Sequence, residues 1–179
     1  GLLGELDFHQ ELSHLRELRR HLDPARRLTV PQPYPALSAR TVLTMQFFTG
    51  QPIRKLQPKS AAARAAVEEA VLAFFRQVLV DGVFHGDPHG GNLLYGEDGT
   101  VCMIDLGMVG RLSQEQRDDI VTLAIATIAN DATTIARVLL NKYRQINNAQ
   151  VRDFSPAALA AIENYEWPGN VRELENRVK

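Results

Sequence analysis

The residues best suited to chemistry lie on both sides of a short apolar hairpin pattern. Asp87 and Asn92 are five residues apart before it, and Asp105 comes thirteen residues after Asn92. In phosphoryl transfer, an aspartate orients the attacking hydroxyl, while an asparagine and a second aspartate hold the Mg²⁺ that neutralises phosphate oxygens. We therefore predict Asp87 as a catalytic residue and Asn92 and Asp105 as magnesium ligands, because Mg²⁺ prefers oxygen donors.

Two other interpretations of this segment stay open. Asp and Asn are ordinary turn residues, so each of them alone could simply shape a loop. His85, Asp87 and His89 could also form a transition-metal site, because alternate residues of an extended segment can face one way. Pro88 and the neighbouring glycines weaken that arrangement. We expect His85 to pack or hydrogen-bond inside the loop, and His89 to lie beside the phosphates of a nucleotide.

The elements that must position these residues are a long helix and the hairpin. Ser60 can cap a helix that runs to Asp81, where Gly82 can end it. Its predicted buried stripe consists of Val67, Val71, Phe74, Phe75 and Val78. The hairpin strands are predicted at 93–95 and 101–104, joined by a turn with an Asp-Gly step.

Other elements flank this centre. Apolar spacing predicts an amphipathic helix over 5–21, and β-branched and aromatic residues predict a strand over 41–48, after a proline-rich connector at 31–35. Four more helices are predicted: from Ser113 (with Gln116) to about 129, from Asp131 to about 147, from Ser155 to about 165, and from Asn170 (with Glu173) onward. We therefore expect an α+β fold that is mainly helical.

Composition limits the possible partners. The chain has 179 residues, 45% of them hydrophobic and 23% charged, and a formal net charge of -1. This balance predicts no nucleic acid, strongly anionic membrane or acidic tail as an obligatory partner. The single cysteine, Cys102, excludes an internal disulfide, fits a reducing compartment and is expected to be buried. No apolar run is long enough to span a membrane, so we expect a soluble, cytoplasmic protein. Because the chain begins with Gly1, we expect its natural start upstream.

The segments 85–92 and 104–112 resemble the UbiB-like atypical kinases, which are known for coenzyme Q biosynthesis. Small-molecule kinases that act on aminoglycosides and choline share part of the pattern, but the Gly-Met-Val-Gly run after Asp105 favours the UbiB-like group. With 5–11 and 42–45, the resemblance covers residues 1 to about 139. It implies a kinase-like C-lobe that binds Mg²⁺ and ATP, ATPase-type activity, and a quinone-pathway or lipid substrate. It also implies a location peripheral to the inner membrane.

The resemblance assigns roles to individual residues. Asp87 would be the catalytic-loop aspartate, Asn92 and Asp105 the magnesium ligands, and either Glu5 or Glu11 the helix acid that pairs with an ATP-binding lysine. No lysine precedes Lys55, and no glycine-rich phosphate loop is found there. We expect both on a missing upstream lobe, and therefore weak or absent turnover by this chain alone.

The tail resembles a different family. Residues 154–159 and 165–176, with their Trp-Pro-Gly-Asn-Val-Arg-Glu-Leu string, look like the end of the AAA+ module in bacterial activators of sigma-N-dependent transcription. The resemblance covers about 140–179 and implies that Arg172 is a sensor arginine for ATP. No Gly-x-x-x-x-Gly-Lys loop accompanies it, so a helical appendage with an exposed arginine is the simpler interpretation.

Two different endings in one short chain suggest a fusion of gene fragments, natural or introduced by assembly, with the seam near 139–143. The leading interpretation is a truncated UbiB-like kinase C-lobe over 1–139, followed by an AAA+ lid-like fragment over 140–179. One alternative is a non-catalytic helical interaction or regulatory fragment. The other is a remnant of a sigma-N-dependent transcription regulator.

Overall fold

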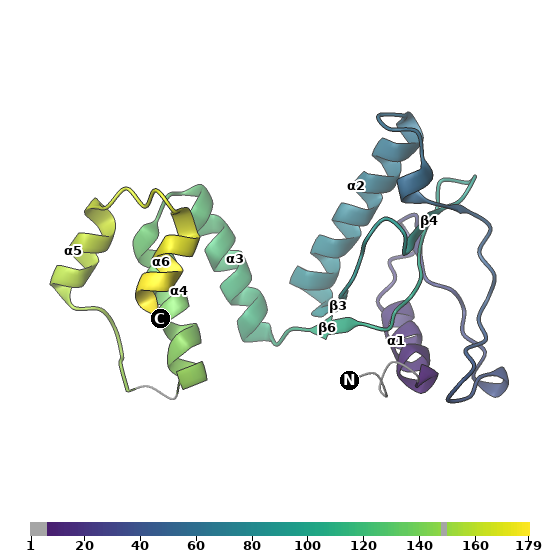
Figure 1. Cartoon of the computed structure of the whole chain (residues 1–179), viewed down its shortest axis with the longest axis horizontal. Helices are drawn as coiled ribbons and strands as arrows, with labels where there is room; N and C mark the ends of the chain where they lie inside the picture. Colours follow the sequence, from purple (N-terminus) through teal and green to yellow (C-terminus); the bar gives the residue numbers. More distant parts are fainter. Residues whose placement is uncertain (1–6, 148–149) are drawn as a thin grey trace. The chain divides into compact units, whose positions relative to one another are not determined.

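The computed structural model describes residues 7–147 and 150–179 of an α+β protein (Figure 1). The chain divides into two compact units, residues 1–113 and 114–179. Among the described residues, the first unit contains two α-helices, three short 3-10 or π-helical turns and all the strands, and the second contains four α-helices. The predicted α+β class is confirmed; the helical share is about half rather than the predicted main part of the chain.

Two helices frame the first unit. α1 (Phe8–Arg20) begins after Asp7, whose carboxylate accepts a hydrogen bond from the His9 N–H at 3.0 Å. α2 (Ala61–Arg76) begins after Ser60, whose Oγ accepts from the Ala63 N–H at 3.1 Å, as predicted. α2 continues as a π-helical turn, η3 (Gln77–Asp81), and ends at Gly82 with φ +70°.

The buried face of α2 differs from the prediction. Four of the five predicted stripe residues are exposed: Val67, Val71, Phe74 and Phe75. Val78 is buried in the turn that follows, but the buried residues of α2 itself are two alanines, Ala66 and Ala73. Small side chains allow a helix backbone to approach closely, and α2 contacts β1 and β5 of the neighbouring sheet. The largest apolar residues were therefore the wrong guide to the inner face.

The main sheet has four short strands in the order β1-β5-β4-β2. The strands are β1 (Leu28–Thr29), β2 (Gln51–Pro52), β4 (Leu93–Tyr95) and β5 (Val101–Met103). β4 and β5 form the predicted antiparallel hairpin, and Gly99 in its turn has φ +83°. β1 joins the other edge of β5 in parallel, with Leu28 opposite Val101.

A second sheet pairs β3 (Val83–His85) with β6 (Val109–Arg111), antiparallel. Phe84 faces Gly110, where an added Cβ would lie 2.2 Å from the Phe84 ring, so this position requires glycine. β3 leads into the segment with Asp87, and β6 follows the segment with Asp105. The pairing therefore holds the two candidate site segments at one end.

The predicted strand over 41–48 is wrong. This segment makes only isolated bridges, between Pro33 and Met45 and between Ala39 and Val42. Its neighbour is the proline-rich connector, and proline has no N–H to donate to a ladder. Strand-forming side chains alone could not supply the missing partner.

The first unit has its own hydrophobic core. Its buried cluster consists of Leu15, Leu18, Val30, Ala66, Leu93, Val101, Met103 and Leu106. Cys102 is fully buried, as predicted, and burial raises the pKa of its thiol from 9.0 to about 12. This thiol is therefore a core group rather than a reactive one.

The second unit is a helical cluster. It contains α3 (Gln114–Ile128), α4 (Ala132–Asn147), α5 (Pro156–Asn164) and α6 (Asn170–Val178). Asp131 and Ser155 cap α4 and α5 as predicted, by accepting from the N–H groups of Thr134 and Ala158. For α6 the cap is Gly169 rather than Asn170, and Glu173 reaches back to the Gly169 N–H at 2.9 Å.

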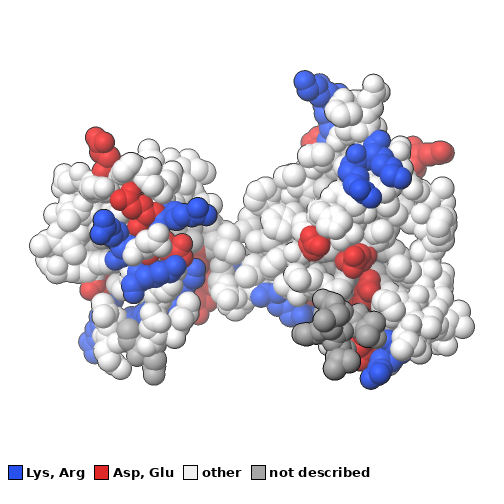
Figure 2. All heavy atoms as spheres, in the orientation of Figure 1, with Lys and Arg blue, Asp and Glu red and all other residues white. Residues whose placement is uncertain are grey.

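A separate apolar cluster holds these helices together, and it includes Ala126, Ile135, Ala136, Leu139, Ile162 and Leu174. Trp167 packs against it, and its indole N–H donates to the Ile162 carbonyl at 2.9 Å. Both signs of charge occur on the face of each unit shown in Figure 2. In the described part of the chain, no helix has the length and apolar character that crossing a membrane requires.

Candidate functional site

The loop between β3 and β4 fixes the main chain of Asp87 and leaves its carboxylate exposed. The Asp87 N–H donates to Nδ1 of His85 at 3.2 Å, and the Asp87 carbonyl accepts from the His89 N–H at 2.9 Å. The Asp87 side chain is 60% exposed, and its Oδ2 lies 3.7 Å from Nε2 of His89. An anchored backbone with a free carboxylate suits a group that must meet an incoming hydroxyl.

Asn92 joins the two candidate site segments. Asn92 is buried, and its side-chain Nδ2 donates to the Asp87 carbonyl at 3.3 Å. Its main-chain carbonyl accepts from the Ile104 N–H at 2.8 Å. Ile104 immediately precedes Asp105. Asn92 therefore ties the loop of Asp87 to the end of the strand that carries Asp105.

Asp105 lies in a strained backbone conformation, with φ +56°. Non-glycine residues rarely adopt this region, and such strain is concentrated at functional sites. The next residue, Leu106, is held by α1 through both of its backbone groups. Its N–H donates to Glu11 Oε1 at 3.1 Å, and its carbonyl lies 2.7 Å from Nδ1 of His14.

The carboxylates of Glu11 and Asp105 interact unfavourably. Burial, followed by the charge of Asp105, raises the pKa of Glu11 above its ordinary value of 4.5. The hydrogen bond from Leu106 and the charge of His14 act in the opposite direction. A cation beside Asp105 would relieve this repulsion.

His85 supports the loop from within. Its ring is buried, with Nδ1 accepting from the Asp87 N–H and Nε2 facing the Ile104 carbonyl at 3.2 Å. Burial lowers the pKa of His85 below its ordinary value of 6.5, although Ile104, Asp105 and Asp87 oppose that shift. Because both ring nitrogens are engaged, the structure does not support a metal triad of His85, Asp87 and His89. In residues 7–147 and 150–179, no three His, Cys, Asp or Glu side chains could hold a metal ion together.

The oxygen donors of the two candidate site segments suit Mg²⁺ in chemical type. Asn92 and Asp105 would supply an amide oxygen and a carboxylate, a set that needs no third protein ligand because Mg²⁺ usually keeps several waters. The excess negative charge around Asp105 is the feature that a divalent cation would balance. The assignment of these two residues as magnesium ligands stays a prediction.

The remaining predicted site residues are distributed more widely. Glu11 lies beside the Asp105 segment, whereas Glu5 falls outside the described residues. His89 lies on the loop, where Nδ1 accepts from the Gly91 N–H at 3.0 Å. Arg172 is exposed on α6, in the other compact unit.

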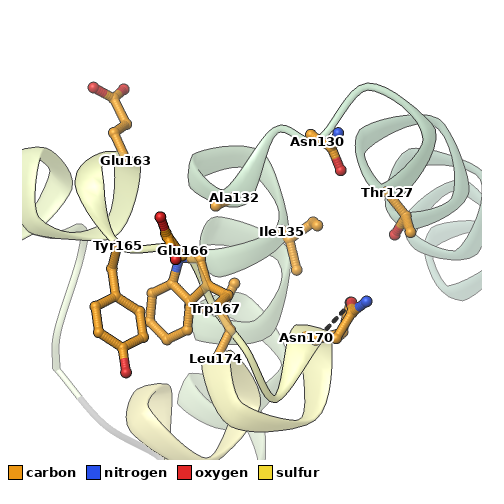
Figure 3. A pocket seen from close by; sticks show the side chains of 11 residues that line it. Thr127, Asn130, Ala132, Ile135, Glu163, Tyr165, Glu166, Trp167, Asn170 and Leu174 are labelled. Atoms are coloured by element: carbon orange, nitrogen blue, oxygen red, sulfur yellow. Dashed lines mark hydrogen bonds between the residues drawn. The ribbon is translucent and has the colours of Figure 1, made fainter.

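The second unit contains a cavity of about 380 Å³ near Arg172's helix (Figure 3). Trp167, Tyr165, Ile135, Asn130 and Asn170 are among the residues that line it. The Tyr165 and Trp167 rings meet edge to face, with centroids 5.0 Å apart. Arg172 is not a lining residue, so this cavity adds no support for its predicted role with nucleotide.

Two supporting residues were missed from the sequence, His14 and Gln77. His14 lies one helical turn after Glu11, so both can reach Leu106, and this spacing was an available signal. Gln77 follows Arg76 between two apolar runs, and it accepts a hydrogen bond from the His85 N–H at 3.1 Å. With a charged residue beside it, nothing in the local sequence marked it as a buried supporting residue.

Two family models match the chain. One, described as an ABC1 atypical kinase-like domain, matches residues 1–139. The other, described as an AAA+ ATPase lid domain, matches residues 129–179. The models overlap at 129–139, and the predicted boundary between residues 139 and 140 stays a prediction.

Curated relatives agree with the first match. A protein named probable protein kinase UbiB, from Sodalis glossinidius, is 29% identical over 169 residues, covering 90% of this chain and 31% of the relative. An uncharacterized protein of Synechocystis sp. is 34% identical over 149 residues, covering 75% of this chain and 36% of the relative. The chain thus spans about a third of these relatives' length. The UbiB alignment extends past residue 139, where the kinase-like family model ends.

A solved structure supports the fold. The structure of Rv3197 from Mycobacterium tuberculosis, determined in complex with erythromycin, matches with a TM-score of 0.55 and 18% sequence identity. The match covers 98% of this chain and 54% of the Rv3197 chain. At this identity the likeness concerns the fold alone.

Proposed function

Because this chain belongs to the ABC1 atypical kinase-like family and also carries an AAA+ lid-like domain, we propose that its first unit binds a magnesium nucleotide for phosphoryl transfer. The single observation that carries this proposal is the position of Asn92. This one buried residue connects the loop of Asp87, through its side-chain amide, to the residue before Asp105, through its main-chain carbonyl. The segments that carry the residue types required for phosphoryl transfer are thus tied to each other by hydrogen bonds.

Each residue has a separate role in this proposal. Asp87 orients the hydroxyl that accepts the phosphoryl group and takes its proton. Asn92 and Asp105 would hold Mg²⁺, and a bound Mg²⁺ would supply charge neutralisation at the phosphate oxygens. Glu11 and His14 fix the main chain beside Asp105, so that its carboxylate keeps one direction.

The finer parts of the proposal rest on the family. Several relatives are named probable protein kinase UbiB, and a nucleotide ligand follows from the kinase-like family. We propose ATP as that nucleotide and a quinone-pathway or lipid compound as the acceptor. We expect slow turnover by residues 1–179, because no lysine precedes Lys55 to pair with the phosphates.

A thermal-shift titration with ATP, with and without magnesium, tests the proposal. Nucleotide at a hundred times its dissociation constant should stabilise the first unit by about 2.7 kcal/mol. The Asp105→Asn variant should lose the part of this stabilisation that depends on magnesium. Glu97→Gln, an exposed acid in the hairpin turn of the same unit, serves as the control and should keep it.

Equal melting of the parent and Asp105→Asn proteins at every nucleotide concentration would contradict the proposal. That result would favour the non-catalytic alternative, in which the helices serve only for interaction.

A further inference from the structure

The end of α2 has an unusual local structure. Its last turn, Gln77–Asp81, is π-helical, a rare form that occurs mostly as single turns within α-helices and frequently at functional sites. Gln77 opens this turn and points inward, with 5% of the residue exposed. An amide is costly to bury unless it is hydrogen-bonded, so its partners indicate what it does.

The Gln77 amide contacts both strands that lead to the candidate site. Oε1 accepts from the His85 N–H at 3.1 Å, and Nε2 donates to Sδ of Met103 at 3.5 Å. His85 ends β3 and lies two residues before Asp87. Met103 ends β5 and lies two residues before Asp105. One side chain therefore connects equivalent points ahead of both carboxylates.

The contact continues into the loop. His85 accepts from the Asp87 N–H, and Asn92 donates to the Asp87 carbonyl. Gln77, His85 and Asn92 are the buried polar or charged residues in the described part of the chain. All three belong to this one set, which surrounds the Asp87 backbone. Networks of this kind are stiff only while every member keeps its partners.

Side-chain contacts connect the π-helical turn to the chain that follows α1. Arg76, just before the turn, lies 2.9 Å from Asp23 and 3.7 Å from Asp81, the last residue of the turn. His21, at the end of α1, lies 3.9 Å from Asp81. The turn is thereby anchored to the chain that follows α1, and Gln77 has a fixed base from which to reach the strands.

We propose that Gln77 is a positioning residue of the candidate phosphoryl-transfer site, setting the separation of Asp87 and Asp105 without touching the nucleotide. This inference rests on the proposed function. Removing the acceptor of the buried His85 N–H lowers the stability of the loop, because a buried donor is left without a hydrogen bond. The loop can then shift, which changes the positions of the site residues.

Two substitutions and one matched control test this role in the full chain. Gln77→Met keeps the length and volume of the side chain but removes both hydrogen bonds. Gln77→Glu keeps an acceptor for the His85 N–H. Ser60→Ala removes the cap at the opposite end of α2, so it weakens the helix without touching the site.

Two measurements separate positioning from general destabilisation. Residue-resolved hydrogen exchange without nucleotide should show the His85 and Asp87 amides exchanging about tenfold faster in Gln77→Met than in Ser60→Ala. Titration with Mg-ATP should show about tenfold weaker binding by Gln77→Met, a smaller loss for Gln77→Glu, and parent-like affinity for Ser60→Ala.

The inference is overturned if the amide exchange rates and Mg-ATP affinity of Gln77→Met stay within twofold of the parent values. It is also overturned if Ser60→Ala shows the same faster exchange and weaker binding as Gln77→Met. If the parent itself does not bind Mg-ATP, the proposed function fails, while the exchange measurement still decides whether Gln77 holds the loop.

Discussion

Glu11 occupies an environment that favours its protonated form. Burial and the nearby charge of Asp105 raise its pKa above 4.5, and the hydrogen bond from the Leu106 N–H offsets only part of this increase. A carboxyl with a raised pKa binds its proton more tightly in the folded than in the unfolded chain. The free energy of unfolding therefore falls as pH rises from 4.5 to the raised pKa, and then stays at the lower level.

Replacing Glu11 with glutamine should remove this pH dependence. Without magnesium, we expect Glu11→Gln to be more stable than the parent above the raised pKa and to approach it below pH 4.5. Urea denaturation of both proteins between pH 4 and 8 measures the difference, with Glu97→Gln as the control. Parallel stability profiles for parent and variant would show that Glu11 ionises without penalty.

Residue types and spacing predicted that Asp87, Asn92 and Asp105 form one site. The structure brings their segments together through Asn92, while their catalytic and metal-binding roles stay predictions. His14 and Gln77 act on Leu106 and His85, 92 and 8 residues away along the chain. The spacing of His14 after Glu11 was an available signal, but a local pattern does not say which distant backbone group such a side chain will meet.

Among the secondary-structure elements, those with local causes were predictable and those with distant partners were not. The helices that begin at Ser60, Asp131 and Ser155 start with a side chain that accepts from a nearby N–H, and all three were predicted. β1 and the β3–β6 pair were missed, because very short strands form only where a remote strand meets them. The strand expected over 41–48 lacked such a partner.

The helix caps permit a quantitative test. Ser60→Ala should lower the stability of the first unit by about 1 kcal/mol, because the Ala63 N–H loses its acceptor. Ser60→Asn should restore most of it, since asparagine is an equally good cap. Urea denaturation gives both values. Identical midpoints for the parent and Ser60→Ala would mean that the cap contributes nothing.

Across the whole molecule, each compact unit has its own apolar cluster and also its own natural probe. Cys102, the single cysteine, is buried in the first unit, and Trp167, the single tryptophan, packs in the second. A buried thiol with a pKa of about 12 reacts only when its surroundings open. The two probes therefore report on different cores.

We expect two separable unfolding transitions in urea, one followed by Cys102 labelling and the other by Trp167 fluorescence. Ser60→Ala should shift the Cys102 midpoint by about 0.5 M and leave the Trp167 midpoint unchanged. Ser155→Ala, which removes the α5 cap, should do the reverse. A single transition that both variants shift equally would show one cooperative fold.

The parallel pairing of β1 with β5 also affects synthesis of the protein on the ribosome. Leu28 has no strand partner until Val101 has been made, and the intervening residues take about 4 to 15 s to translate. During that interval α1 and β1 are nascent chain without their sheet. Their apolar residues, Leu15 and Leu18 among them, stay without the rest of their core during that interval, so this segment depends on protection from aggregation until β5 has been made.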